Sequence, residues 1–434
     1  MSESLNLALL GCGVVGGGVA KLLLEQRERL TRRAGRPLSL KRVVVRDRTK
    51  PRAVPLPPEL ISTDLQAAIH DPDVHVIVEL IGGTTVARKA VLDALAAGKH
   101  VVTANKALLA LHGPEVYEAA RQAERTVAFE ATVAGGVPIV ASLAQCLAAN
   151  QITAIQGILN GTSNFILTAM SEQGQTYKAA LAEAQRRGYA EADPTLDVDG
   201  SDATHKLAIL AHLAFGVAVH PDAISRRGIA DIHEMDVRFA NELGHRVKLL
   251  AEAWLSEGLL ALQVAPVLLR HSTPLAQIRG SYNAIQVHGD AVGDTLFYGP
   301  GAGAMPTASA VVADLIDLAV GRAQRTFQSL RLWELREAGA SLRHADTVKS
   351  RFYLRLLVED RPGVLADVCR CLADEHVSIS SVIQHEALDE QEGNIVPLVI
   401  LTHTVPTGRF RAAAERMNRL PGVTSPSVYY SVGD

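Results

Sequence analysis

Three glycines near the start of the chain restrict the fold more than any other feature. Gly11, Gly13 and Gly16 follow the apolar run Leu5–Leu10 and precede an Ala- and Leu-rich stretch that predicts a helix over Val19–Arg33. A G-x-G-x-x-G motif between a strand and a helix is typical of a dinucleotide-binding βαβ unit, because glycines permit the tight turn and the close approach of a pyrophosphate. The helix N-terminus supplies positive partial charge. The motif therefore predicts a nucleotide site, with a structural turn that binds no ligand as the alternative.

Strand and helix patterns continue to alternate after this unit, which predicts a doubly wound parallel sheet. Ligands of such sheets bind beyond the carboxyl ends of the strands. Lys106 lies just past one strand, so it is a candidate site residue, with an ordinary surface lysine as the alternative. The predicted strands are Leu40–Val45, Val74–Leu80, His100–Thr103 and Thr126–Glu130, and the predicted helix Ala87–Ala97 stops at Gly98.

The end of the second predicted strand bears on the choice of nucleotide. An acidic residue there binds the ribose 2′-hydroxyl of NAD, whereas an arginine there favours the 2′-phosphate of NADP. Arg46 and Asp47 are adjacent here, and further basic residues follow. The charge favours NADP over NAD, with Arg46 as the phosphate partner, and a solvated turn remains the alternative.

Composition excludes several classes of partner. The 434 residues carry 43 Lys and Arg against 46 Asp and Glu, a net charge of −3, which leaves no basic excess for nucleic acid. No apolar run approaches the ~18–20 residues that span a bilayer, and the N-terminus lacks the pattern of a signal peptide. Four scattered cysteines do not form a disulfide framework. We expect a cytoplasmic protein of two to four domains without nucleic-acid or membrane partners.

The richest polar segment runs from Gly188 to Lys206. It contains five carboxylates before an apolar helix, Leu207–Phe215. Asp202 and Lys206 are four residues apart, so on a helix they share one face and can form an ion pair. A partly buried lysine beside a carboxylate is a candidate proton donor. The alternative is an acidic loop that caps the helix.

Two further loops offer polar groups. Ala131–Pro138 could combine backbone carbonyls with the Glu130 carboxylate into an oxygen-only site for a hard cation, or it could be a plain glycine loop. Asn160–Asn164 predicts a turn and helix start, since Thr162 and Ser163 are good N-caps, and it would also offer hydroxyl and amide groups to a polar substrate.

The C-terminal part follows a different pattern. Strand, helix, strand, strand, helix and strand are predicted in that order, which indicates a βαββαβ, ferredoxin-like domain. Gly363, at the first helix start, allows a ligand to approach the backbone closely. The segments are Arg351–Val358, a helix ending at Glu375, Val377–Ile383, Ile395–Thr402, Arg409–Arg419 and Val423–Val432.

Four ordered motifs resemble the homoserine dehydrogenase family. They are GCGVVGGG from Gly11, VVTANKALLA from Val101, NGTSNFIL from Asn160 and GYAEADPTLDVDGSDATHKLAIL from Gly188. VGDTLFYGPGAGAMPTASAVVADL, from Val292, is similar to the segment with which that family returns to its nucleotide fold, so the resemblance covers roughly residues 5–321.

The resemblance implies reversible, nicotinamide-dependent conversion of L-aspartate 4-semialdehyde to L-homoserine, a step toward threonine, methionine and isoleucine. It makes Lys206 the general acid, Asp202 the residue that orients it, and Lys106 a polarising residue beside both the carbonyl and the cofactor. The residues that the resemblance implies for substrate binding are Glu191, Asp197 and Tyr189. It implies further cofactor contacts at Val14, Val15 and Gly303. It also implies a monovalent cation, sodium or potassium, near Glu130, Val133, Gly135 and Val137.

The segment from Val358 to Val382 resembles the ACT family of small-ligand regulatory domains. This resemblance implies feedback by an amino acid, for which threonine is the expected regulator, bound near Asp360, Gly363 and Leu365. A domain that serves only to dimerise is the alternative.

These inferences together predict the fold class and the domain limits. We expect an α/β chain with a Rossmann-type nucleotide-binding domain, an α+β catalytic and dimerisation domain and a ferredoxin-like ACT domain, assembled as a homodimer or homotetramer. Another semialdehyde dehydrogenase, or a sensor that has lost catalysis, are the alternatives. The nucleotide-binding domain is expected over 1–131 and is completed by about 301–321. The catalytic and dimerisation domain is expected over 132–300, a linker over 322–349 and the ACT domain over 350–434.

Overall fold

The computed structural model describes residues 3–52, 54–334, 340–384 and 395–433. In the expected linker, residues 335–339 lie outside the described part. In the expected C-terminal domain, residues 385–394 and 434 lie outside it. The chain divides into two compact units. Unit 1 comprises Met1–Gly161, Asp202–Ile224 and Ser281–Ser341, and unit 2 comprises Thr162–Ser201, Ser225–Gly280 and Leu342–Asp434.

Unit 1 contains a six-stranded sheet in the order β3-β2-β1-β4-β5-β6, and every neighbouring pair is parallel. This is the strand order of a doubly wound dinucleotide-binding fold, as the sequence predicted. The strands are β1 Leu5–Leu10, β2 Leu38–Val44, β3 Ile61–Ser62, β4 Val76–Glu79, β5 His100–Thr103 and β6 Val127–Ala128. The helices around them are α1 Val14–Glu25, α2 Arg27–Ala34, α3 Leu65–Ile69, α4 Val86–Ala96, α5 Lys106–Gln122, α12 Ala304–Ala319 and α13 Arg322–Leu330.

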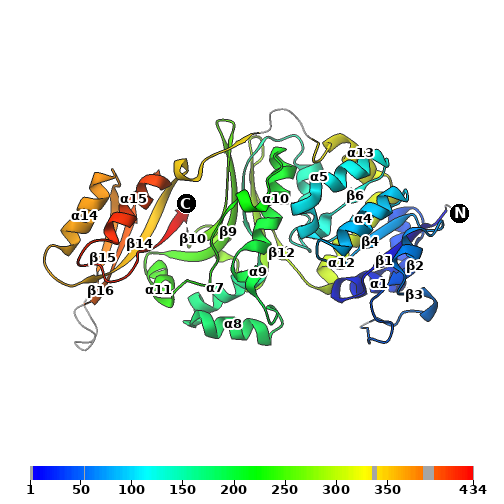
Figure 1. The fold of residues 1–434 in the computed structure, drawn as a ribbon, viewed down its shortest axis with the longest axis horizontal. Coiled ribbons are helices and arrows are strands. Elements are labelled where there is room, and N and C mark those ends of the chain that lie inside the picture. The colour runs from blue at the N-terminus through cyan, green and yellow to red at the C-terminus, as the bar shows by residue number, and fades with distance from the viewer. Residues whose placement is uncertain (1–2, 53, 335–339, 385–394, 434) are drawn as a thin grey trace. The chain divides into compact units, whose positions relative to one another are not determined.

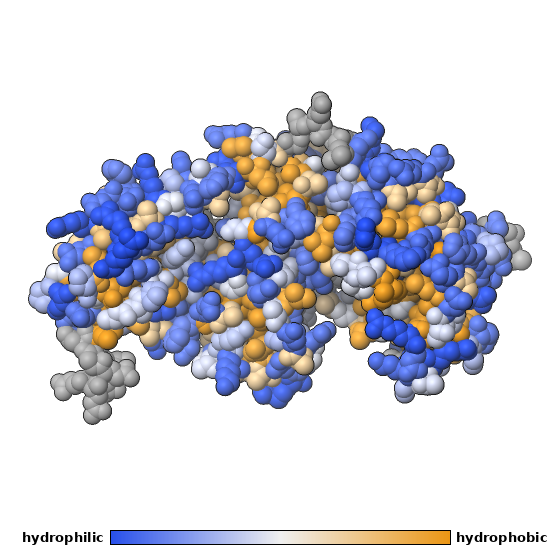
Figure 2. All heavy atoms as spheres, in the orientation of Figure 1, coloured by the Kyte–Doolittle hydropathy of each residue, from blue (hydrophilic) through white to orange (hydrophobic). Residues whose placement is uncertain are grey.

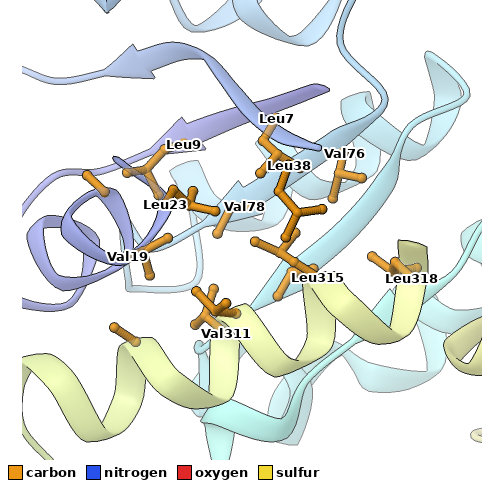
Figure 3. Close-up of a cluster of buried hydrophobic side chains, with 14 of the residues drawn as sticks. Leu7, Leu9, Val19, Leu23, Leu38, Val76, Val78, Val311, Leu315 and Leu318 are labelled. Carbon is orange, nitrogen blue, oxygen red and sulfur yellow. The ribbon is translucent and has the colours of Figure 1, made fainter. Parts of the chain in front are cut away.

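Helix α12 comes late in the chain and packs against the first helix, α1 (Figures 1 and 3). Val311 and Leu315 of α12 join the buried cluster that contains Leu9 of β1 and Val19 of α1. Gly18 allows this close approach, because a Cβ there would lie 2.6 Å from the carbonyl oxygen of Ala304. The late segment therefore completes the nucleotide-binding core.

Several predicted elements in and around this sheet are wrong in their limits. The strand predicted over Leu40–Val45 spans Leu38–Val44, and that predicted over Val74–Leu80 spans Val76–Glu79. The helix predicted over Val19–Arg33 begins earlier, at Val14, and is interrupted at Gln26, which has φ −112° and ψ 22°. The strand predicted over Thr126–Glu130 spans only two residues, because Glu130 already belongs to a 3₁₀ turn.

The remaining strands of unit 1 are antiparallel: β7 Ile152–Ile158, β11 Tyr282–Gly289 and β12 Gly293–Pro300. The short helix α6 Ile139–Ala141 leads toward them, and α10 Ser201–Phe215 carries the apolar stretch predicted to be helical. Part of the expected linker is also packed into this unit, since Trp333 is 7% exposed and stacks on His212 with ring centroids 4.2 Å apart.

Unit 2 combines helices with a long antiparallel hairpin. The hairpin strands are β9 His245–Ser256 and β10 Leu259–Arg270. The other elements before the C-terminal segment are α7 Gly161–Gln173, α8 Tyr177–Arg186, α9 Thr195–Val198, β8 Ser225–Arg226 and α11 Glu234–Glu242.

The C-terminal segment of unit 2 has the predicted βαββαβ order. Its strands lie in the order β18-β14-β16-β15, with the last strand beside the first, and β18 also pairs with β10. Predicted limits differ most for the last strand, which starts at Val428 instead of Val423. The elements are β13 Ser341–Leu342, β14 Lys349–Glu359, α14 Val364–Asp374, β15 Ile379–Gln384, β16 Ile395–Thr402, β17 Val405–Pro406, α15 Thr407–Met417 and β18 Val428–Gly433.

Hydrophilic residues cover much of the face drawn in Figure 2, with hydrophobic atoms visible between them. Within the described residues, no single helix combines the length and apolarity needed to cross a membrane. Among the described helices, only α12 and α13 taken together pass that test, and they are bent by 90° to each other.

Candidate active site

The glycine loop has the geometry of a phosphate-binding turn. Gly11 has φ 95°, and a Cβ there would lie 2.6 Å from the carbonyl oxygen of Leu80. A Cβ on Gly16 would lie 2.2 Å from the carbonyl oxygen of Gly11, so both positions require glycine. Gly13 is the N-cap of α1, and nothing lies within 4 Å of a Cβ built on it. Open space in front of a helix N-terminus fits the pyrophosphate of a dinucleotide.

Other predicted cofactor residues lie at exposed positions of unit 1. Val14, the first residue of α1, is 73% exposed, and Val15 beside it is partly buried. Gly303, with φ 123°, is the N-cap of α12. Arg46 is exposed just after β2. The neighbouring Asp47 carboxylate accepts hydrogen bonds from the Thr49 backbone and hydroxyl, both at 2.7 Å, and these bonds lower its pKa.

A single carboxylate, that of Asp202, holds both predicted catalytic lysines. Its Oδ1 lies 2.9 Å from Nζ of Lys106, and its Oδ2 lies 2.7 Å from Nζ of Lys206. Lys206 also donates to the carbonyl oxygen of Leu159 at 2.7 Å, and Asn160 donates to Oδ2 of Asp202 at 2.9 Å. The ion pair predicted from the i,i+4 spacing is therefore present, and it includes Lys106, which lies 96 positions earlier in the chain.

The electrostatics of this cluster favour its charged form. Burial alone would raise the pKa of Asp202, but the ammonium groups of Lys206 and Lys106, together with the Asn160 amide, hold it well below its usual range. The Lys206 side chain is 10% exposed, whereas that of Lys106 is 40% exposed. A buried ammonium beside a more accessible one can both donate a proton and stabilise negative charge on a substrate oxygen.

Lys106 is positioned by a chain of buried polar groups at the carboxyl ends of β4 and β5. Glu79, 0% exposed, accepts from the backbone of Gly82 at 3.0 Å and from the Thr103 hydroxyl at 2.7 Å. Asn105 caps α5 by accepting from Leu108 and donates to the carbonyl of Gly83 at 2.7 Å. This chain fixes the first residue of α5, which is Lys106.

Glu79, Asn105 and Asn283 were not predicted as site residues, whereas Asn160 lies in a loop that was expected to offer polar groups to a substrate. Asn283 donates to the same Leu159 carbonyl that accepts from Lys206, at 3.1 Å. The position of Glu79 at the end of a buried strand was a usable signal for its role. Asn283 offered no such signal, because its partner is 124 residues away.

The predicted substrate residues lie in unit 2 on one connected segment. Glu191 is exposed and Asp197 is half-buried in the short helix α9. Tyr189 is 43% exposed, and its ring lies 5.0 Å from that of Phe165.

Thr162 and Ser163 do not cap their helix as predicted. Both lie in the first turn of α7, because the helix already begins at Gly161. Their hydroxyls instead donate to the carbonyls of Tyr189 at 2.7 Å and Asp197 at 2.8 Å, which ties α7 to the acidic segment.

The predicted cation loop borders a largely apolar cavity of about 340 Å³ in unit 1, whose lining includes the carboxylates of Glu130, Asp314 and Asp317. The Glu130 carboxylate accepts from the backbone of Val140 at 3.0 Å and of Ala141 at 2.7 Å, and Asp314 accepts from the Glu130 backbone at 2.9 Å. Burial raises the pKa of Glu130 to about 7, and burial and Glu130 raise that of Asp314. The described residues that line the cavity include Asp317 but no Lys, Arg or His.

The predicted cation loop carries donors that suit a hard cation in chemistry, although only Glu130 and Gly135 of its predicted cation residues line the cavity. Val133 and Val137 are buried, and Gly135 has φ 22° in a turn where a Cβ would lie 2.9 Å from Oγ1 of Thr307. The Val137 carbonyl accepts from Ile139 at 2.8 Å, and a carbonyl oxygen retains a second lone pair. Oxygen-only donors with excess negative charge favour an alkali or alkaline-earth ion.

The predicted regulatory residues surround the start of α14 in unit 2. Gly363 is its N-cap with φ 98°, and Leu365 is 41% exposed. The Asp360 carboxylate accepts from the Gln384 amide at 3.1 Å.

The cysteines do not suit nucleophilic catalysis. Burial raises the pKa of Cys12 in the glycine loop, which disfavours the thiolate. Cys146 is exposed in a π-helical turn.

A doubly wound sheet, a glycine phosphate loop and a carboxylate that holds two lysines define an NAD(P)-dependent oxidoreductase. Family comparisons agree. Residues 11–130 match the family model described as homoserine dehydrogenase, NAD binding domain, residues 138–316 match that described as homoserine dehydrogenase, and residues 352–422 match the ACT domain.

Relatives match along nearly the whole chain. A homoserine dehydrogenase from Pseudomonas aeruginosa is 43% identical and covers 98% of each chain. The crystal structure of a homoserine dehydrogenase from Thiobacillus denitrificans has a TM-score of 0.92 at 42% identity and covers 100% of this chain and 99% of its own. A hyperthermophilic archaeal homoserine dehydrogenase in complex with NADPH has a TM-score of 0.60 at 27% identity, with 73% and 97% covered. The chain belongs to the homoserine dehydrogenase family.

Proposed function

We propose that this chain reversibly reduces L-aspartate 4-semialdehyde to L-homoserine with NAD(P)H, in the cytoplasm, as a step toward threonine, methionine and isoleucine. The observation that supports this most directly is the Asp202 carboxylate between Lys106 and Lys206. When bound, the nicotinamide supplies or accepts the hydride. Each turnover toward homoserine also consumes one proton, which the protein must deliver to the carbonyl oxygen.

The residues of the cluster divide that task. Lys206 gives its proton to the developing alkoxide, and it is recharged from solvent. Lys106 stabilises the negative charge on the same oxygen, since a preorganised ammonium in a poorly solvated site acts strongly on developing charge. Asp202 orients both ammonium groups. Glu191 and Asp197 bind the substrate ammonium, with Tyr189 beside them.

The cofactor is held at the glycine loop by Gly11, Gly13, Gly16, Val14 and Val15, with Lys106 and Gly303 at its nicotinamide end. NADP is the preferred form in this proposal. Exposed Arg46 supports it, as does the relative described as a complex with NADPH. The Asp47 carboxylate is occupied by Thr49, which makes it less suited to a ribose hydroxyl.

A monovalent cation, sodium or potassium, belongs to the same proposal. The Glu130 carboxylate and the carbonyls of Val133, Gly135 and Val137 would hold it, and it orders the loop without a part in hydride transfer. The absence of basic side chains among the described residues around the cavity supports a bound cation.

The ACT domain gives the enzyme feedback control in this proposal. Threonine is the regulator and binds near Asp360, Gly363 and Leu365, in a homodimer or homotetramer. Gly363, with its open N-cap conformation at the start of α14, supports a ligand at that place.

One assay tests the central activity. The full chain is mixed with homoserine and NADP, or with NAD, and the absorbance of reduced nicotinamide is followed. We expect turnover with both and a lower KM for NADP, which Arg46→Ala raises without changing the KM for NAD. A chain that reduces neither cofactor with homoserine would overturn the proposed function.

A further inference from the structure

The strand β8 and the three residues after it contact two functional parts of unit 2. Ser225 and Arg226 pair in parallel with Gln263 and Val264 of β10, and the Arg227 backbone donates to the Val264 carbonyl at 2.8 Å. Successive side chains of an extended segment point to opposite sides. Arg226 and Arg227 can therefore reach different neighbours.

On one side, this segment holds the acidic stretch that carries Glu191 and Asp197. The Ile229 backbone donates to the Val198 carbonyl at 2.8 Å. A Cβ on Gly228 would lie 2.1 Å from that same oxygen, so the two backbones are in direct contact. The Arg226 guanidinium lies 3.9 Å from the Asp199 carboxylate.

On the other side, Arg227 binds the last strand of the ACT domain. Its guanidinium donates to the Tyr429 carbonyl at 2.6 Å, and it lies 4.9 Å from the centre of the Tyr430 ring. A guanidinium over an aromatic face is attracted by the ring. Tyr429 and Tyr430 lie on β18, which pairs with β14 and so belongs to the core of the ACT sheet.

The contacts form a short continuous path. It runs from Tyr429 through the Arg227 side chain and the Gly228–Ile229 backbone to Val198, one residue from Asp197. Every step is a hydrogen bond, a peptide bond or direct backbone contact. Strands β18 and β8 also both pair with β10, so Arg227 adds a side-chain link to a backbone link between the ACT sheet and this segment.

We propose that Arg227 is a positioning residue through which the ACT domain sets the geometry of the substrate-binding stretch Glu191–Asp199. The inference rests on the proposed function, in which that stretch binds the substrate ammonium. According to this inference, a conformational change of the ACT domain alters the affinity of the enzyme for homoserine and leaves the affinity for the cofactor unchanged.

The test compares Arg227→Met and Arg227→Lys in the full chain with Arg238→Met as a matched control. Arg238 is an exposed arginine of the same unit, on α11. We expect Arg227→Met to raise the KM for homoserine roughly 2- to 30-fold, the range found for residues that couple two sites. The kcat and the KM for NADP stay within about twofold. Arg227→Lys, which keeps the charge, recovers part of the affinity.

Amide hydrogen exchange of residues 188–199 provides a readout independent of activity. We expect faster exchange there in Arg227→Met and no change in Arg238→Met. If Arg227→Met leaves both the KM for homoserine and the exchange of residues 188–199 unchanged, the inference is overturned. It is also overturned if kcat and the Tm fall while the KM values for homoserine and NADP both rise, because that pattern indicates a merely structural role. If the unaltered chain fails to oxidise homoserine, the proposed function fails instead, and exchange alone still decides whether Arg227 holds the stretch.

Discussion

Two buried acidic centres of unit 1 handle negative charge in opposite ways. At Asp202, one carboxylate lies between two ammonium groups, and its pKa is lowered. At the cavity, Glu130 and Asp314 lie close together, the described lining residues offer no basic side chain, and both pKa values are raised. A buried charge is stable only when paired or neutralised. The first centre carries its own cations, whereas the second depends on a cation or a proton from outside.

The strongest test of the comparison removes a cation from the first centre. We expect Lys206→Ala to lower kcat by ~10²–10⁴-fold, the usual contribution of a positioned general acid. The measurement is steady-state oxidation of homoserine. Lys89→Ala is the matched control, because Lys89 also forms an i,i+4 ion pair, with Asp93 at 2.6 Å, but on the exposed surface. Near-normal turnover of Lys206→Ala would remove the proton-donor role.

The next test removes the negative charge of Asp202 and keeps the shape of its side chain. Asp202→Asn leaves two lysines without the carboxylate that orients them, so we expect kcat to fall about 10- to 100-fold, the equivalent of the ~1.5–3 kcal/mol of a charged hydrogen bond. Asp93→Asn, which alters only the exposed pair, should leave kcat unchanged. If both variants behave alike, Asp202 has no orienting role.

The sequence predicted one of these centres better than the other, for a physical reason. Asp202 and Lys206 are four residues apart on one helix, so their pairing follows from local geometry. The contact between Asp314 and Glu130 joins residues 184 positions apart and depends on how α12 packs against the loop that carries Glu130. No local pattern carries that information.

The same distinction holds for the fold. Strands Leu5–Leu10, His100–Thr103 and Ile395–Thr402 were predicted with correct limits, because each is an apolar run bounded by glycines or polar residues. The burial of Trp333 was not predicted, since it follows from stacking on His212, which is distant in the sequence. The break at Gln26 was not predicted either. Arg227 likewise gave no signal in the sequence, because its partners lie about 200 positions away.

The third test, with a smaller expected effect, supplies the Glu130–Asp314 centre with positive charge from a monovalent cation and measures the Tm. We expect sodium or potassium to raise the Tm relative to tetramethylammonium at equal ionic strength. At ten times the dissociation constant the gain is about 1.4 kcal/mol, or about 3–6 °C. Glu130→Gln should abolish the difference, whereas Glu115→Gln, which alters an exposed ion pair with Arg88, should retain it. Equal Tm values in all salts would mean that a proton, not a metal ion, neutralises the cavity.

The smallest expected effect is the acid dependence of stability at the first centre. Because the pKa of folded Asp202 is lowered, its ionised form contributes stability that is present above the unfolded pKa of about 4 and is lost as the pH falls toward the folded value. The Tm difference between the unaltered chain and Asp202→Asn should therefore be largest near pH 6 and shrink below about pH 4, by about 2–4 °C for each kcal/mol lost. A gap that widens in acid would mean that burial, not the two lysines, dominates at Asp202, and the contrast between the two centres would disappear.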